Sequence, residues 1–554
     1  MSTFFLNIVV TNFFYLILGK FIMIKFFEKD LNNITSAAIL GVISASFLAL
    51  TINFILPLNI LINSIFYIVI ILAFLFAKVN LTKKDYFFIA ISSIICFLII
   101  LYDYEYRPDA GLYHIPYTHI LNESKIIVGL ANLHSRFGHI SIFQYLAAFN
   151  VNIITKEPGI LIPLASIISF LYIYFFNDIL KLLKKKESFS FGKIFSLLII
   201  IYISYKINRY SEFGNDAPAH LFLFYIVSRF IYLKDYSLKN TNLIYFYCVF
   251  AFLSKIFFIF IFLITFHIFS KNIKNFKGLL ISFPTLVLFL WILKNILISG
   301  CLIFPMENSC FPSLKWTNME FVKHAELEGE AWSKAWPQNY NSELHMKEFV
   351  EDFNWVKAWS SIHLKYIIKI LSPFIIIMVS IFMFLNFRNK FRPDNKSIVL
   401  DDKKYLTLMT VATLGVLSFF LIYPIYRYGY SYIILFLFLV STKIFRIINE
   451  GKFLKISKIM FSICLVSLIS KQLLRIYNHS EQRNYIPSYI FVGQETLTNL
   501  MRLNKFEIIN IDNYTVYYSN NECYYSLAPC TSYKQNTINL RHEKKFTYNI
   551  LYNK

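Results

Sequence analysis

Runs of about 20 apolar residues recur along this chain from one end to the other, and each is long enough to cross the ~30 Å hydrocarbon core of a bilayer as an α-helix. Apolar residues make up 57% of the 554 residues, against about 45–50% in soluble domains. We therefore predict an all-α polytopic membrane protein with about 12–14 transmembrane helices. The predicted spans lie near residues 4–24, 35–55, 60–78, 85–102, 160–180, 190–206, 217–233, 241–254, 256–270, 279–299, 362–386, 405–423, 428–446 and 455–475.

Basic residues predict how these spans are oriented, because Lys and Arg collect in cytoplasmic loops. Clusters at 83–84, 181–186, 271–277 and 388–404 all fall on one side of the predicted membrane, which we take as cytoplasmic. The stretch 139–157 is then interfacial or re-entrant, since counting it as a span would place the lysines of 181–186 outside. The net charge of +22 is explained by these loops and by anionic lipid surfaces. Without a basic, aromatic module, the sequence does not favour nucleic-acid binding.

The polar segments share the opposite, outer face. We divide the chain into N-terminal helices (1–102), an outer-face loop with interfacial helices (103–158), further transmembrane helices (159–299), a large outer loop (300–361), more transmembrane helices (362–475) and an outer C-terminal cap (476–554). The cap carries the alternating stretches FEIINI and YTVYYS, which are typical of β-strands. The predicted location is the inner membrane of a bacterium, with the active face periplasmic.

Cysteine positions agree with an oxidising outer face. Cys301 and Cys310 share the large outer loop, and Cys523 and Cys530 share the cap, so we predict two disulfides. A metal site at either pair is less favoured because nothing nearby completes a four-ligand set. The other three cysteines lie within spans and are predicted to be apolar fillers: Cys96, Cys248 and Cys464.

The most polar segment of an otherwise apolar chain, residues 103–141, contains Asp109 between Pro108 and Gly111. A carboxylate just outside a span could deprotonate an acceptor hydroxyl as a general base. It could equally hold a divalent metal ion against a phosphate, or cap the helix that follows.

Four further residues of this segment are candidates for substrate binding. His114 could bind phosphate or shuttle a proton, and Arg136 could clamp a phosphate with its planar guanidinium. Asn132 and His134 precede Arg136 in GLANLHSRFG. His114 could instead be an interfacial hydrogen-bonding group, and Arg136 could instead anchor the loop to lipid headgroups. His114 and His119 are five residues apart and do not share a helix face, which disfavours a metal pair.

Three charged residues elsewhere could join this segment. Asp216 begins a span on the outer face, where it could act beside Asp109 or simply complement the helix N-terminus. Arg427, between Tyr426 and Tyr428, suits a lipid-linked phosphate or an aromatic belt. Lys255 interrupts the apolar stretch 241–270 and is either functional or reaches the interface.

Several motifs, in order along the chain, resemble a poorly characterised family of bacterial polytopic membrane proteins. They are D-x-G-L-Y-H (109–114), G-L-A-N-L-H-S-R-F-G (129–138), K-N-I-L-I-S-G-C-L-I-F-P (294–305) with Trp316 downstream, R-Y-G-Y (427–430) and A-P-C-T (528–531). That family in turn resembles the GT-C superfamily of integral membrane glycosyltransferases.

The resemblance implies roles for these residues. Asp109 would be the catalytic base and Asp216 a second carboxylate, with a polyprenyl-phosphate sugar as donor. Arg427 and Lys255 would contact the donor phosphate, and Trp316 would be a further substrate-binding residue. This chain departs from the simple GT-C pattern, because three predicted spans precede the one before Asp109 and the usual adjacent acidic pair is missing.

Together these features lead us to expect a membrane glycosyltransferase that acts on an outer-face acceptor in surface glycan assembly. The alternatives are a polysaccharide polymerase or ligase of another fold, in which arginines would matter more than Asp109, and a lipid-linked glycan transporter or flippase. The latter would place charges at the bilayer midplane in two related halves. The sequence names neither the sugar nor the acceptor, and it leaves open the oligomeric state and whether a divalent metal ion is required.

Overall fold

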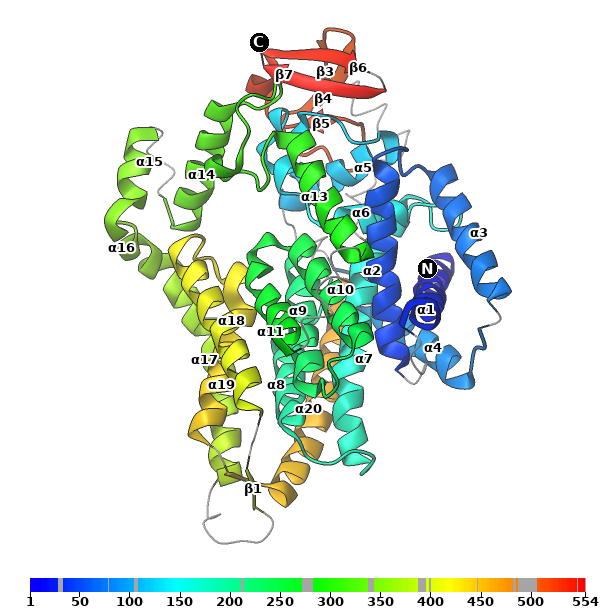
Figure 1. Cartoon of the computed structure of the whole chain (residues 1–554), viewed down its shortest axis with the longest axis vertical. Helices are drawn as coiled ribbons and strands as arrows, with labels where there is room; N and C mark the ends of the chain where they lie inside the picture. Colours follow the sequence, from blue (N-terminus) through cyan, green and yellow to red (C-terminus); the bar gives the residue numbers. More distant parts are fainter. Residues whose placement is uncertain are drawn as a thin grey trace.

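The structure is a computed structural model of the whole chain. It describes residues 1–27, 33–77, 79–103, 108–210, 214–271, 282–336, 343–386, 395–397, 400–445, 447–481, 485–486, 506–545 and 547–553. Helices form most of the molecule, with a small β-region at one end of its long axis (Figure 1).

Every predicted span overlaps a helix, although residues 279–281 of one predicted span lie outside the described residues. The apolar stretch around Lys255 is broken, because α10 ends at Ser254 and a 3-10 turn (Ile256–Ile261) precedes α11. The helices are α1 (Ser2–Phe27), α2 (Ile34–Asn53), α3 (Ile60–Phe76), α4 (Lys83–Ile100), α7 (Ile162–Leu183), α8 (Phe191–Lys206), α9 (Asp216–Tyr232), α10 (Leu238–Ser254), α11 (Phe262–Lys271), α13 (Phe283–Ser299), α17 (Lys365–Asn386), α18 (Asp402–Leu421), α19 (Tyr426–Ile444) and α20 (Glu450–His479).

Six helical segments of the described chain are long and apolar enough to cross a membrane, fewer than the 12–14 predicted. Several of the other predicted spans form short helices: α8 has 16 residues and α9 has 17. At 1.5 Å per residue they reach about 24–26 Å, less than the ~30 Å core. The six segments are Ser2–Phe27, Ile34–Asn53, Glu157–Leu183, Val356–Asn386, Asp402–Leu421 and Glu450–His479, and shorter apolar helices cover Ile60–Phe76, Ile256–Lys271 and Phe283–Ser299.

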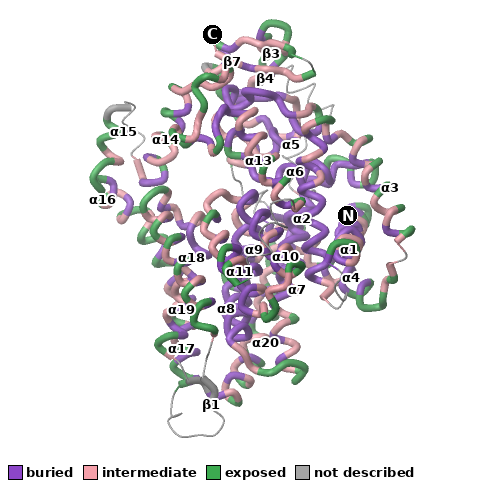
Figure 2. Tube along the Cα trace, viewed as in Figure 1, coloured by how far each residue is buried: buried purple, intermediate pink, exposed green. Residues whose placement is uncertain are grey.

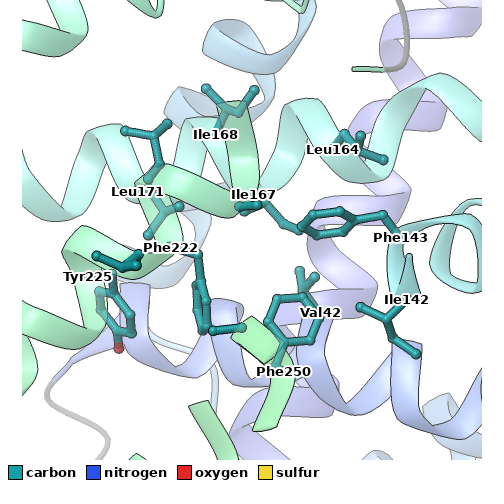
Figure 3. Close-up of a cluster of buried hydrophobic side chains, with 14 of the residues drawn as sticks. Val42, Ile142, Phe143, Leu164, Ile167, Ile168, Leu171, Phe222, Tyr225 and Phe250 are labelled. Carbon is teal, nitrogen blue, oxygen red and sulfur yellow. The ribbon is translucent and has the colours of Figure 1, made fainter. Parts of the chain in front are cut away.

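Small and aromatic residues explain how the helices pack. The α1 and α2 backbones meet at two glycines: a Cβ on Gly19 would lie 1.7 Å from the Ala37 carbonyl oxygen, and one on Gly41 would lie 1.8 Å from that of Tyr15. Such close approach is a common way of joining helices in a membrane. Figure 3 shows part of the core, where Phe143, Phe222 and Phe250 pack together with residues of α2 and α7.

Two short helices from the predicted outer-face loop enter the protein interior. After a π-helical turn (Ala110–His114), α5 covers Ile115–Glu123 and α6 covers Ile142–Phe149. Every residue of α6 is buried, so this part of the stretch 139–157 is packed against protein (Figure 2). The large loop 300–361 contains α14 (Met319–Ser333), α15 (Glu343–Val350) and the short α16 (Val356–Trp359).

The C-terminal cap contains the predicted strands. FEIINI forms β3 (Phe506–Ile511) and YTVYYS forms β4 (Tyr514–Ser519), paired antiparallel, while β5 (Cys530–Thr531) joins β4 in parallel. The strands β6 (Leu540–Lys545) and β7 (Tyr548–Asn553) form an antiparallel pair. A short pair, β1 (Asn395–Ser397) with β2 (Ile447–Asn449), lies at the opposite end of the molecule (Figure 1).

Both predicted disulfides are present. Cys301 is bonded to Cys310 in the large loop, and Cys523 is bonded to Cys530 in the cap. The remaining cysteines are free and buried in helices, as expected of apolar fillers: Cys96, Cys248 and Cys464.

Candidate functional site

A cavity of about 250 Å³ brings together charged residues that lie far apart in the sequence. Two carboxylates, three cations and several aromatic side chains line it. They come from the π-helical turn, the loop before α6, the start of α9, the break after α10, α13, α14 and the start of α19. The lining residues are Asp109, Ala110, Tyr113, His114, Arg136, His139, Ile140, Ser141, Gly214, Asn215, Asp216, Leu253, Ser254, Lys255, Ile256, Phe257, Trp291, Ala325, Gly329, Trp332, Ser333, Tyr423, Arg427 and Tyr428.

Asp109 pairs with Arg427 across 318 residues of sequence. Arg427 Nη1 lies 3.2 Å from Asp109 Oδ2. Asp109 precedes the π-helical turn, but its side chain makes no capping hydrogen bond, so it does not act as a helix cap. Among the described residues, Asp109 Oδ1 has no hydrogen-bond partner, and the side chain is 37% exposed. One carboxylate oxygen is therefore held by a guanidinium while the other is available to a ligand.

The second carboxylate, Asp216, pairs with Lys255. Lys255 lies where α10 breaks, and its Nζ donates to Asp216 Oδ1 at 2.6 Å and to the Arg427 carbonyl oxygen at 3.0 Å. His220 Nε2 contacts the same carbonyl at 2.9 Å. The Arg427 side chain thus reaches Asp109 while its backbone is bound to the Lys255–Asp216 pair. The two carboxylates belong to one hydrogen-bonded network.

Arg136 is the cation in this cavity without a carboxylate partner. Within the described part of the chain, its guanidinium makes no hydrogen bond or ion pair. Two other donors at the wall, Arg427 Nε and Trp291 Nε1, are buried and lack a hydrogen-bond partner among those residues. Buried donors are normally satisfied, so these two groups could donate to a bound ligand, since no described residue supplies their acceptor.

His114 lies in the cavity as a neutral ring. Burial lowers its pKa to about 4. The nearby carboxylates of Asp109 and Asp216 act to raise the pKa, but they offset only part of the effect of burial. The amide nitrogen of Gln144 lies 2.7 Å from His114 Nδ1, and that of Asn215 lies 3.5 Å away. Because amide nitrogens donate, Nδ1 accepts and the ring proton is on Nε2. His114 is therefore a hydrogen-bond donor at neutral pH, and it carries no charge.

Three residues predicted to bind substrate lie outside the cavity and make contacts within the protein. Asn132 Nδ2 donates to the backbone carbonyls of Trp316 and Leu551, and Trp316 Nε1 donates to that of Ile296. His134 Nδ1 accepts from the Arg136 backbone N–H, and burial lowers its pKa to about 3. None of the three lines the cavity, so substrate binding by these residues stays a prediction.

Sequence reasoning missed the aromatic wall of the cavity. The Arg427 guanidinium lies 5.2 Å from the Tyr428 ring centre and 5.9 Å from that of Trp332, and Lys255 Nζ lies 4.5 Å from Tyr428. Tyr428 flanks Arg427 in the sequence and could have been proposed from that position. Nothing in the sequence distinguished Trp332 and Trp291 as site residues, since aromatic residues are frequent throughout this chain.

The cavity also offers little to a divalent metal ion. The described residues include no group of three or more His, Cys, Asp or Glu side chains placed to hold one. Both carboxylates are paired with a cation, at 3.2 Å for Asp109 and 2.6 Å for Asp216, so a metal ion bound to either carboxylate would lie close to a positive charge. We therefore assign no chemical step to a metal ion.

The fold and the cavity define the class: a multi-helix membrane protein with a charged cavity beneath a small β-cap. A family described as "Domain of unknown function (DUF8201)" matches residues 1–434. This match covers most of the chain, and the protein belongs to that family. No curated protein and no solved structure matches the chain.

Proposed function

We propose that this protein is an integral membrane glycosyltransferase that moves a sugar from a polyprenyl-phosphate donor to an acceptor on the outer face of the membrane. The observation that carries the proposal is the cavity, in which Asp109 and Asp216 meet Arg136, Lys255 and Arg427. Strongly charged, convergent groups in a cleft are typical of sites for chemistry.

Asp109 is the proposed general base. Its Oδ2 is held by Arg427, which fixes the orientation of the carboxylate, and Oδ1 can receive the proton of an acceptor hydroxyl. The acceptor oxygen then bonds to the anomeric carbon of the sugar. The bond from that carbon to the phosphate oxygen breaks, and its electrons leave with the polyprenyl phosphate. Asp216, bound to Lys255, positions the backbone of Arg427.

The charge of the cavity supports a phosphodiester as donor. Among the lining residues that the structure describes, three cations (Arg136, Lys255 and Arg427) face two carboxylates (Asp109 and Asp216), which leaves one positive charge, and His114 is neutral. A sugar linked to a polyprenyl phosphate carries one negative charge. Arg136 is the cation that would meet it, because an unpaired guanidinium binds phosphate strongly.

The motifs resemble a family of bacterial membrane proteins that in turn resembles the GT-C glycosyltransferases, and this supports the same proposal. The resemblance includes Asp109, and it accounts for an enzyme embedded in the membrane. A donor attached to lipid reaches an outer-face site that nucleotide sugars do not.

The test is sugar transfer in membranes from a radiolabelled polyprenyl-phosphate sugar. We expect Asp109→Asn to lower transfer by roughly 100-fold or more, the usual contribution of a general base. Asp512→Asn is the matched control, since this cap carboxylate pairs with Arg541 at the surface. Equal protein levels and melting temperatures for both variants exclude misfolding as the cause.

The alternatives give different results. Full transfer by Asp109→Asn contradicts the catalytic base. If Arg136→Gln then abolishes glycan formation, a polymerase or ligase that depends on arginines fits better. If labelled lipid crosses the membrane without losing its sugar, the protein is a transporter or flippase.

A further inference from the structure

A second cavity, of about 570 Å³, lies along the side of the helical body and shares no residue with the charged cavity. Its floor is α7, and its walls are α4 and α20. Both wall helices pack on α7, which lies between them in Figure 1. The groove therefore runs between α4 and α20, with α7 at its base.

The lining is apolar and follows one face of α4. Phe87, Ile91, Ile95 and Ile99 recur at intervals of four residues, which places them in a row along the helix. From Lys84 to Ile99 the helix rises about 22 Å, and the α20 wall from Phe461 to Gln472 rises about 16 Å. One leaflet of the hydrocarbon core is about 15 Å deep. Both walls are therefore long enough to hold an acyl chain across the depth of one leaflet.

One end of the groove is basic. Lys84 and Lys181 line it there, and Lys184, Lys185 and Lys186 follow directly in the sequence. Asp178 also lies at this end, but its oxygens are taken up by Lys193 Nζ at 2.6 Å, Ser196 Oγ at 2.7 Å and Tyr232 OH at 2.9 Å.

Lys84 is the cation available to a ligand at this end. Its ammonium makes no hydrogen bond or ion pair with any residue that the structure describes. Lys181 pairs with Glu187 at 3.0 Å, and both side chains are about two-fifths exposed, so that surface pair is weak. Among the residues that the structure describes, an anion placed beside Lys84 would therefore meet positive charge, because the Asp178 carboxylate at this end is already paired.

We propose that this groove binds one anionic glycerophospholipid from the leaflet at its lysine end. The headgroup phosphate lies beside Lys84, and one acyl chain follows α4 between α7 and α20. Basic pockets between membrane helices are suited to anionic headgroups. The proposal is independent of the glycosyltransferase activity, because none of its residues lines the charged cavity.

The test uses full-length protein in nanodiscs that contain equal amounts of phosphatidylglycerol and phosphatidylethanolamine. After transfer to a mild detergent, native mass spectrometry counts the lipid that stays bound. We expect one retained phosphatidylglycerol per chain. Lys84→Gln should lower its retention about fivefold, the equivalent of about 1 kcal/mol for one lysine near a headgroup, while Lys83→Gln should not. Lys83 is the adjacent, exposed lysine outside the groove.

A second pair of variants tests the acyl-chain site. Ile95→Trp fills the groove and should abolish retention, whereas Ile94→Trp, on the exposed face of the same helix, should leave it unchanged. Equal retention of the two phospholipids, or retention unaffected by Lys84→Gln and Ile95→Trp, overturns the proposal. Selective retention of a polyprenyl lipid in place of phosphatidylglycerol overturns it as well. Any of these results leaves the Asp109 assay unaffected.

Discussion

Lys255 is the residue on which the cavity network depends most. It interrupts an apolar stretch, and it joins Asp216 to the Arg427 backbone. The Lys255 side chain is 14% exposed and that of Asp216 is 31% exposed, so this pair is partly shielded from water. A charge in such a place is costly unless its partner is present.

Replacing Lys255 with Met should therefore destabilise the protein. Breaking a fully buried pair costs about 3–5 kcal/mol, and we expect about 1–3 kcal/mol here because Asp216 retains access to the cavity. Denaturant unfolding in detergent micelles measures the change. The double variant Asp216→Asn, Lys255→Met should recover part of the loss, since it leaves no unpaired carboxylate.

Lys315→Met provides the matched control. Lys315 pairs with Glu543 at 2.5 Å, but both side chains are about half exposed, and its loss should change stability too little to measure. A Lys255→Met protein as stable as the Lys315→Met protein would contradict the importance of the buried network.

At the scale of single residues, the sequence identified charges better than their partners. The strong polarity of Asp109, Asp216, Lys255 and Arg427 in an apolar chain marked them as candidates, and all four line one cavity. Their pairing could not be derived, because Asp109 and Arg427 meet only through the tertiary fold. Asn132 was a candidate from the same polar segment as Asp109, and nothing local revealed that it binds one backbone carbonyl of the large loop and one of the cap.

Among the structural elements, the π-helical turn after Asp109 is hydrogen-bonded to the cap. The Gly111 carbonyl oxygen accepts hydrogen bonds from the backbone N–H groups of Cys523 and Tyr524, both at 3.0 Å. These two donors lie in the loop closed by the Cys523–Cys530 disulfide. The cap thus contacts the chain two residues from Asp109.

Gly111→Ala should disturb this contact. A Cβ at position 111 would lie 2.5 Å from the Tyr524 ring and 2.8 Å from Glu522 Cβ, and overpacking of this kind costs about 1–3 kcal/mol. Hydrogen exchange of the segment 108–116 should rise together with that of the 520–530 loop, because the two are hydrogen-bonded to each other.

Gly329→Ala should stabilise the protein, in contrast to Gly111→Ala. Gly329 is in the interior of α14, and the nearest atoms to an added Cβ are 3.8 Å away, on Tyr423. Alanine favours a helix by up to about 1 kcal/mol over glycine. Faster exchange at 108–116 in this variant, or unchanged exchange in Gly111→Ala, would show that the cap does not hold the turn.

Helices and strands were the most predictable elements. Runs of apolar residues predicted the helices, and the alternating pattern of FEIINI predicted β3. The docking of the cap was beyond reach of the sequence, since the backbone of Val128 pairs with the far end of the chain at Asn549 and Leu551. Backbone hydrogen bonds between distant segments leave no residue pattern to detect.

Considered as a whole, the molecule separates its polar ends along its long axis. The β-cap lies at one end, and the β1–β2 pair lies at the other (Figure 1). Between them, helices such as α20 expose apolar side chains. In an 18-residue apolar stretch of α20, only 22% is buried inside the protein (Figure 2). Such an apolar, exposed surface is stable against lipid and costly against water.

This arrangement predicts that the cap and the loop after α7 lie on opposite sides of the membrane. Asn513, at the β3–β4 turn, and Lys185, between α7 and α8, are both exposed. A cysteine introduced at either position adds an accessible thiol. Labelling then reports on that position, because every described native cysteine is buried or disulfide-bonded. In intact cells, a membrane-impermeant maleimide should label Asn513→Cys and should reach Lys185→Cys only after permeabilisation, since the lysine-rich loop is expected in the cytoplasm. The reverse pattern would place the charged cavity on the cytoplasmic side, where a lipid-linked donor is no longer required. Labelling of both positions from one side would mean that the helices do not span the bilayer along the long axis of the molecule.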